Sequence, residues 1–469
     1  MIPDRTSVPR STVEPSSGRS IQARVPVYKG RFGRKEAERL LWRAGFGPKG
    51  DEAAKLAKLG LTRAVDSLVY PRKEKLTGPK PRDEDGGRLA PRDAWGHDGL
   101  WWLDRMIRTR RPLMERMTLV WHDWFATSNG EVDSPVFMLR QNGLFRKHAL
   151  GSFRKLLLDV THDPAMLTFL SGIYSTRESP NENYARELME LFTLGAGNGY
   201  TEDDVREQAR ALTGWTADWK EGKGLVNFRF AKRLHDRGTK QVFGRSGRYD
   251  WADACNLCVR HAEHPSFFVD KLWSYFVPTP PDPATKRALV RMYRKSGYKI
   301  RPIVRAVLRH PDFHEGPRMV KPPAVYIAGL LRATGQGIRT ESWTWISGLA
   351  GQQLFYPPNV AGWDETRWLD TSTYRGRWVI ANEVIGEKAR DPGSAGRDWR
   401  KLSAEQLVNR ALRFWGSPSI SPSTRAELLA FARRSLADAV EEWQKDSYAL
   451  MTENALRQLV AVSPDLQTA

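Results

Sequence analysis

Helix start signals recur along most of this chain, and they constrain its fold more than any other feature of the sequence. At four places a good N-cap residue stands directly before a proline, which suits the first helical position because it lacks a backbone N–H. These pairs are Ser134-Pro135, Asp163-Pro164, Ser179-Pro180 and Asp282-Pro283. Thr201 and Asp204 have the spacing of a capping box, and short amphipathic segments follow one another from Lys35 onward. The pattern predicts an all-α protein.

One stretch, residues 226–230 (VNFRF), alternates between apolar and polar side chains as a strand does. A turn-like HDRGTK and then QVFG follow it, so we predict a small β-hairpin insert near 226–243. Residues 1–33 are rich in Pro, Ser and Arg, which predicts a disordered basic arm. Residues 34–390 form the predicted multi-helix main domain. After a Gly-rich break, residues 391–469 form a C-terminal helical appendage.

The charge of the chain is strongly positive. Its 74 Lys and Arg residues exceed its 54 Asp and Glu residues, and the net charge is +20. Such a field attracts polyanions such as nucleic acid, anionic lipid or acidic polysaccharide, although a solubilising charge spread over the surface explains it as well. With two cysteines the chain has no disulfide framework. No apolar run approaches the length of a membrane span, so we expect no integral membrane segment.

The most distinctive stretch is SPNENYARELMELFTLG at residues 179–195. On a helix, its apolar side chains form one stripe. A second stripe is polar and consists of Asn183, Arg186, Glu187 and Glu190. This stripe is either a solvated face with an Arg186–Glu190 pair, or a carboxylate pair for acid–base work or metal binding. We predict that Asn183, Glu187 and Glu190 face an internal polar cleft and not bulk solvent, because the same helix already has a full apolar stripe for packing.

Two further polar residues are candidates for the same site. The helix predicted over 114–128 has Met117, Trp121 and Trp124 on one side, whereas His122 lies on the other side with further polar residues. A single histidine in this setting is commonly structural. Asp163 has a capping role that explains it without chemistry. We predict that the polar stripe meets His122 or Asp163 in the internal cleft.

The spacing of Cys255, Cys258, His261 and His264 is that of a metal-binding quartet. The segment DWADACNLCVRHAEH is, however, predicted to be one continuous helix. Residues three apart on an α-helix advance by ~300°, so the four side chains would fan over about half of its circumference. They would not enclose one zinc ion. We therefore predict buried cysteines and no metal site here.

Several stretches together resemble the bacterial domain-of-unknown-function 1800 family, from about Lys35 to about Glu383. They are WHDWF (121–125), RKHALGSFRKLLLDVTHDPAML (146–167), NENYARELMELFTLGAGNGYTEDDVREQARALTGW (181–215), FFVDKLWSYFV (267–277), KPPAVYIAGLLRATG (321–335) and GQQLFYPPNVAGW (351–363). The resemblance implies an envelope or secreted setting and a sulfatase-like or phosphatase-like companion protein. It implies no established reaction and no particular cofactor.

This chain departs from the family pattern in two ways. The usual Trp-His-Asn-His-Phe is Trp121-His122-Asp123-Trp124-Phe125 here, so the second histidine of a two-histidine metal site is missing. The basic N-terminal residues also lack the apolar segment of a secretory signal, which favours the cytoplasm for the chain as written. The secreted or envelope location implied by the resemblance stays open beside it.

Three functions follow from these features. The first is an envelope-associated binding or assembly protein that recognises a polyanionic polymer or a partner protein through its basic surface and 18 Trp residues. The second is a metal-assisted hydrolase or transferase acting on an envelope polymer through His122, Asp163 and the polar stripe. The third is nonspecific nucleic-acid binding. No sequence motif supports specific nucleic-acid recognition. Whether the motif side chains converge in one pocket distinguishes the first two.

Overall fold

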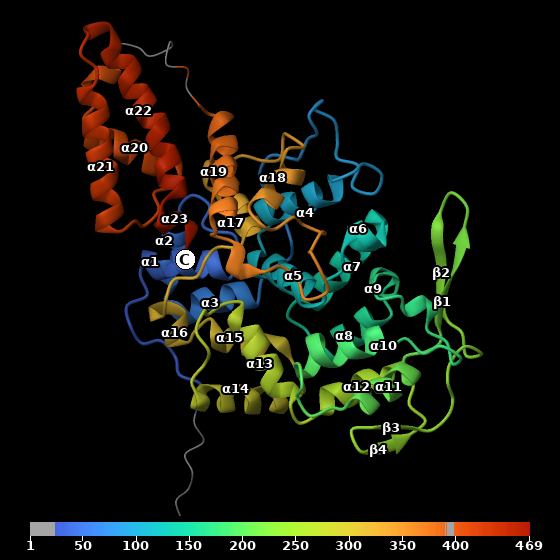
Figure 1. The fold of residues 1–469 in the computed structure, drawn as a ribbon. Helices are drawn as coiled ribbons and strands as arrows, with labels where there is room; N and C mark the ends of the chain where they lie inside the picture. The colour runs from blue at the N-terminus through green and yellow to red at the C-terminus, as the bar shows by residue number, and fades with distance from the viewer. Residues whose placement is uncertain (1–23, 390, 392–397) are drawn as a thin grey trace, which may run out of the picture.

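The structure is a computed structural model, and it describes residues 24–389, 391 and 398–469 (Figure 1). The first 23 residues of the predicted basic arm and most of the predicted break at 391–399 lie outside the described residues. Residues 24–33 of the arm run along the main body, where the Tyr28 N–H donates to the Arg309 carbonyl and Phe32 packs on the core. No helix in the described part is long and apolar enough to cross a membrane.

Helices make up nearly all of the regular structure, so the predicted all-α class is confirmed. Before the strands lie α1 (Arg34–Arg43), α2 (Glu52–Leu59), α3 (Leu61–Val69), α4 (His97–Arg108), α5 (Pro112–Trp124), α6 (Asn129–Val132), α7 (Pro135–His148), α8 (Phe153–Thr161), α9 (Pro164–Phe169), the 3-10 helix η1 (Gly172–Tyr174), α10 (Glu182–Glu187), the π-helix η2 (Leu188–Leu194) and α11 (Glu202–Ala211). After the strands come α12 (Trp251–Arg260), α13 (His264–Ser274), α14 (Pro283–Lys295), α15 (Ile300–Val307), α16 (Pro311–Glu315), α17 (Pro323–Thr334), α18 (Trp343–Leu349), η3 (Glu365–Arg367), α19 (Thr371–Gly386), η5 (Trp399–Lys401), α20 (Ala404–Phe414), α21 (Pro422–Ala437), α22 (Glu442–Val462) and α23 (Pro464–Gln467).

The predicted start signals mostly cap the helices that they precede. The side chains of Ser134, Asp163 and Asp282 accept hydrogen bonds from backbone N–H groups of α7, α9 and α14. Thr201 and Asp204 form the expected capping box at α11. Ser179 does not cap a helix, because α10 begins three residues later with Asn181 as its N-cap.

The strands in the described residues form two small antiparallel pairs, apart from isolated bridges. Strand β1 (Trp215–Lys220) pairs with β2 (Gly224–Phe230), and β3 (Lys240–Val242) pairs with β4 (Arg245–Gly247). The predicted strand at 226–230 is present, but its partner precedes it in the chain. The expected second strand of the hairpin, around residues 241–244, does not return along β2, since β3 pairs with β4 instead.

Helix α5 lies between the two large hydrophobic clusters of the core. Met117, Trp121 and Trp124 belong to the first cluster, which α8 and α11–α15 also build. Leu119 belongs to the second cluster, which α4, α17 and α19–α22 build. The polar side of α5 is therefore buried as well, and Glu115 there is held by Arg105 and Arg146.

The C-terminal helices α20, α21 and α22 group on one side of the view in Figure 1, and the β1–β2 hairpin projects on the other. They are not detached from the main body. The backbones of Met319 and Ala469 exchange hydrogen bonds of 2.8 Å, and the Lys321 ammonium donates to the Leu466 carbonyl at 2.6 Å. These contacts join the segment that precedes α17 to the end of the chain.

Candidate functional site

The polar stripe predicted in the 179–195 segment lies on α10 and the first turn of η2. Asn183 is exposed, and Arg186, Glu187 and Glu190 are half-buried. Arg186 makes two hydrogen bonds to Glu202 of α11, at 2.8 and 2.7 Å. None of the hydrogen bonds or ion pairs that the stripe makes in the described part of the chain reaches His122 or Asp163.

Glu187 and Glu190 influence one another through their charges. Burial raises the pKa of Glu187 above its ordinary value, and the nearby negative charge of Glu190 raises it further. The positive charge of Arg186 acts in the opposite direction. The two carboxylates are therefore neighbours on the surface of one helix, as the spacing predicted.

The second half of the segment is a π-helix, which the sequence analysis missed. A run of such turns is rare and often marks a functional site. Its last carbonyls are bonded by side chains from elsewhere: Lys271 to Leu191 (2.9 Å), Trp124 to Phe192 (3.1 Å), His264 to Thr193 (3.0 Å) and Asn198 to Leu194 (3.0 Å). The apolar spacing of this segment fits an α-helix equally well, so it held no signal for the π-helix.

His122 is enclosed by aromatic rings at the boundary of the two core clusters. Its ring centroid lies 5.3 Å from Trp102, 5.5 Å from Phe355 and 5.4 Å from Trp363. Neither ring nitrogen has a hydrogen-bond partner in the structure. Burial lowers the pKa of His122 to about 3, so the imidazole is neutral at physiological pH.

Asp163 is buried in a different setting. Its Oδ2 accepts hydrogen bonds from the Ala165 N–H at 3.0 Å and from the Gln141 amide at 3.0 Å. Its Oδ1 has no partner in the structure. Burial raises the pKa of Asp163 to about 7, while the hydrogen bond from the Met166 N–H acts against this rise. The carboxylate is thus an N-cap held inside the core.

Asp123, which sequence reasoning passed over, joins three of the family-like motifs. Its carboxylate accepts a 2.6 Å hydrogen bond from the Tyr275 hydroxyl and a 2.8 Å bond from the Trp363 N–H. Gly362 lies so close that a Cβ there would overlap the Asp123 carboxylate. Burial lowers the pKa of nearby Lys271 to about 8, and the charge of Asp123 opposes that fall. Asp123 therefore fastens the 359–363 loop to α5 and α13.

The loop that Asp123 holds forms one wall of an open cleft of about 730 Å³ beside α18 and α19. We call this the α18–α19 cleft. Its lining is Gly348, Leu349, Gly351, Gln353, Tyr356, Pro358, Trp363, Asp364, Arg367, Ser372, Thr373, Arg375, Gly376 and Val379. Helices α18 and α19 meet closely at Gly376, where a Cβ would overlap the Leu349 carbonyl. Five of the thirteen residues of the GQQLFYPPNVAGW motif thus border a space large enough for a ligand.

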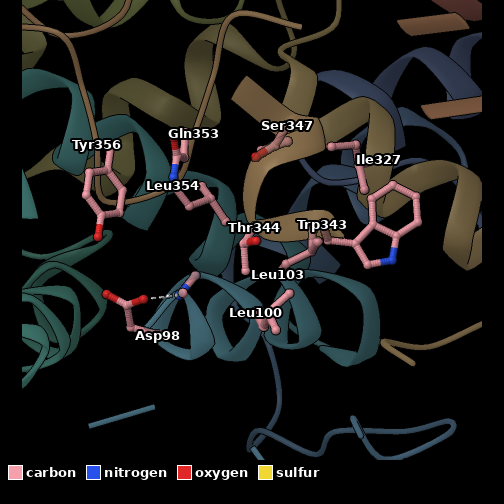
Figure 2. Close-up of a pocket in the computed structure, with 13 residues that line it drawn as sticks. Asp98, Leu100, Leu103, Ile327, Trp343, Thr344, Ser347, Gln353, Leu354 and Tyr356 are labelled. Carbon is pink, nitrogen blue, oxygen red and sulfur yellow. Dashed lines mark hydrogen bonds between the residues drawn. The ribbon is translucent and has the colours of Figure 1, made fainter. Parts of the chain in front are cut away.

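A small inner pocket adjoins this cleft, because Gln353 and Tyr356 line both. Figure 2 shows Tyr356 and Asp98 at one end of the inner pocket and Trp343 and Ile327 at the other. Its volume is about 20 Å³, which is room for about one water molecule. Burial raises the pKa of Asp98, although the Gly99 N–H donates to its carboxylate at 2.8 Å.

Groups suited to a metal ion do not converge in the described part of the chain: no three His, Cys, Asp or Glu side chains there could share one. The predicted continuous helix over 250–264 is wrong, because α12 ends at Arg260 and α13 begins at His264. Both cysteines are buried, and each contacts a different polar side chain. Cys255 lies 3.2 Å from the Thr161 hydroxyl, and Cys258 accepts from Gln208. His264 bonds Thr193 and Tyr293 instead.

Comparison with known proteins gives one match. The family described as "Protein of unknown function (DUF1800)" matches residues 39–468, which extends past Glu383 through α20, α21 and α22. No curated protein matches the chain. No solved structure matches it either.

Proposed function

Since the chain belongs to the DUF1800 family, whose description assigns no function, we propose from the structure that it is a binding protein. Its α18–α19 cleft binds a segment of a polyanionic polymer. An envelope setting and a sulfatase-like or phosphatase-like companion protein accompany this proposal, and both are drawn from the family resemblance rather than from the cleft.

The observation that carries this proposal is the pair of arginines in the cleft. Arg367 and Arg375 are both exposed, and the side chain of Arg367 retains 71% of its accessible surface although it lies 3.6 Å from the Asp370 carboxylate. One acidic side chain, Asp364, lines the same cleft. Guanidinium groups bind carboxylate, sulfate and phosphate through paired hydrogen bonds, so this lining favours an anionic ligand.

Apolar surface beside the arginines supports the same ligand class. Trp345 and Leu349 share the outer face of α18, and 51% and 44% of their surfaces are exposed. Leu349 also lines the cleft, next to Tyr356 and Trp363 in its wall. Rings and guanidinium groups together contact both the apolar faces and the charges of a polymer, as in many binding grooves.

The metal-assisted hydrolase or transferase has less support. The polar stripe, His122 and Asp163 occupy separate places, and no ligand set for a metal is found in the described residues. A catalytic site normally brings its acid, base and nucleophile within hydrogen-bond reach of one another. Binding is therefore the function that the geometry favours.

The test is binding of the full chain to fluorescently labelled heparin, a sulfated polyanion, at several salt concentrations. We expect Arg367→Glu with Arg375→Glu to weaken binding roughly tenfold or more and to flatten its salt dependence. The matched control is Arg92→Glu with Lys295→Glu, which changes the net charge equally at exposed positions outside the cleft lining. Equal losses in both double variants would show that net charge, and not the cleft, binds the polymer.

A further inference from the structure

The β1–β2 hairpin carries an exposed tryptophan away from the body of the protein. Figure 1 shows the hairpin projecting beyond the neighbouring helices. Trp219 lies next to its tip, and 76% of its surface is exposed. Trp219 pairs across the hairpin with Leu225, and the turn between the strands is formed by residues 221–223. Contact between an indole this exposed and a partner surface would be favourable, because apolar surface would be removed from water.

The base of the hairpin is anchored firmly, which holds the tip in place. Trp215 at the start of β1 stacks on His162 at 5.2 Å and meets Trp251 edge to face at 5.5 Å. Phe228 of β2 meets Phe137 of α7 at 5.3 Å. An isolated two-stranded hairpin is only marginally stable, so this packing supplies the support that the strands lack. The packing at the base therefore holds the exposed tip in a defined position.

Two lysines lie close to the exposed indole in the chain. Lys220 directly precedes the turn, Lys223 lies in it, and both are exposed. Residues 215–237 contain six Lys or Arg against three Asp or Glu, a net charge of +3. Two of the three acids are neutralised within the protein, Asp218 by Arg229 and Asp236 by Arg210. The third acid, Glu221, is exposed in the turn between Lys220 and Lys223, so the tip residues 219–224 keep a net charge of +1 for an anionic partner.

We propose that the β1–β2 tip docks on the surface of an anionic lipid bilayer. Trp219 enters the headgroup region, and Lys220 and Lys223 contact lipid phosphates. Tryptophan prefers the membrane–water interface, and lysines beside it extend their charges to the headgroups. A bilayer fits this tip better than a protein does, because a stable protein interface needs about 800 Å² per partner. One indole and two lysines offer much less, whereas shallow insertion requires no matching surface.

The test is co-sedimentation of the full chain with phosphatidylcholine vesicles, prepared with and without phosphatidylglycerol. We expect binding to the vesicles that contain phosphatidylglycerol and little binding to phosphatidylcholine alone. Trp219→Ala should weaken binding roughly tenfold, while Trp219→Phe should retain most of it. Lys220→Ala with Lys223→Ala should weaken binding roughly thirtyfold, and added salt should weaken the wild type in the same way.

Two controls separate this surface from others. Trp95→Ala removes a different exposed tryptophan, 67% exposed, and should leave vesicle binding unchanged. Arg367→Glu with Arg375→Glu alters the α18–α19 cleft and should also leave it unchanged. Circular dichroism and thermal unfolding of each variant verify folding. Equal vesicle binding by Trp219→Ala and wild type, or loss of vesicle binding in the cleft variant, would overturn the proposal.

Discussion

Arg186 of α10 pairs with Glu202 of α11 through two hydrogen bonds, at 2.8 and 2.7 Å, and not with the acidic residues of its own stripe. This bidentate pair connects the two helices at the surface, where 35% of the Arg186 side chain and 61% of the Glu202 side chain are exposed. The pairing raises the pKa of Arg186 and lowers that of Glu202. Glu187 and Glu190 remain neighbouring negative charges that Arg186 influences by its charge, without a hydrogen bond to either in the described residues.

A first prediction follows for Glu187→Gln. Removing one of two neighbouring negative charges relieves repulsion, and the half-buried amide costs less to desolvate than the carboxylate. We expect the free energy of unfolding to rise or stay level, within about half a kcal/mol, in urea denaturation at neutral pH. Glu190→Gln is the control for charge removal from the same stripe. A loss of several kcal/mol in either variant would reveal a structural ion pair, and loss of polymer binding without loss of stability would reveal a functional carboxylate.

Much of the helical fold could be predicted from local signals. The caps at Ser134, Asp163, Asp282 and Thr201 are local events, since each side chain bonds an N–H within three residues of itself. The partner of the 226–230 strand also had a local signal, which the sequence analysis passed over. Residues 215–220 (WTADWK) alternate between apolar and polar side chains, and the glycines after them, Gly222 and Gly224, suit the positive φ that both adopt at the turn.

The candidate cleft could not be predicted in the same way. Asp123 joins Tyr275 and Trp363, which are 152 and 240 residues away in the sequence. Only tertiary packing brings these residues together, and the spacing of residues along one helix does not predict such a contact. The motif 351–363 was recognised, but its place beside Arg367 and Arg375 depends on how α18 and α19 pack. Local periodicity predicts which face of a helix is apolar, not what lies opposite it.

The second prediction concerns His122, whose neutral ring is buried without a hydrogen-bond partner in the structure. A folded-state pKa of about 3, set by burial, lies below the ordinary value of 6.5. Between these two values the unfolded chain binds a proton that the folded chain does not bind, so the free energy of unfolding falls as the pH drops from about 6.5 toward 3. The variant His122→Leu does not have this loss. The free energy of unfolding of the variant, relative to wild type, should therefore be about 2 kcal/mol greater at about pH 5 than at about pH 7.

His264→Leu is the matched control for His122→Leu. His264 is equally buried, and burial lowers its pKa to about 4, but its ring nitrogens lie 3.0 Å from the Thr193 carbonyl and 3.1 Å from the Tyr293 hydroxyl. Leucine leaves those two groups without a partner, so we expect a loss of roughly 1–3 kcal/mol at neutral pH. If His122→Leu causes the same loss at neutral pH, the His122 ring has a polar partner in solution, and our interpretation of it as an unsatisfied core residue is wrong.

The third prediction concerns Asp163, whose effect on stability changes with pH in the opposite direction from that of His122. Burial raises its pKa to about 7 from the ordinary value of 3.8. Between these two values the folded chain holds a proton that the unfolded chain has released, so the free energy of unfolding falls as the pH rises through this range. Below about pH 4 both states are protonated and the carboxyl group carries no such cost. Above about pH 7 the full cost is present, on the order of 4 kcal/mol.

Asp163→Asn should remove that pH dependence while keeping the cap, because asparagine is an equally good N-cap residue and its carbonyl accepts from Ala165 N–H and Gln141 as the carboxylate does. We expect the variant to be more stable than wild type at about pH 8 and close to it at about pH 4, in urea titrations at both values.

Asp282→Asn is the matched control, since Asp282 caps α14 before a proline in the same way, but hydrogen bonding lowers its pKa. That variant should be less stable than wild type at pH values above about 4, where the wild-type carboxylate is charged, and this deficit should shrink as the pH falls below about 4. The same trend in Asp163→Asn would show that the Asp163 carboxylate is stabilised in its charged form and that a cation or an additional donor reaches its Oδ1.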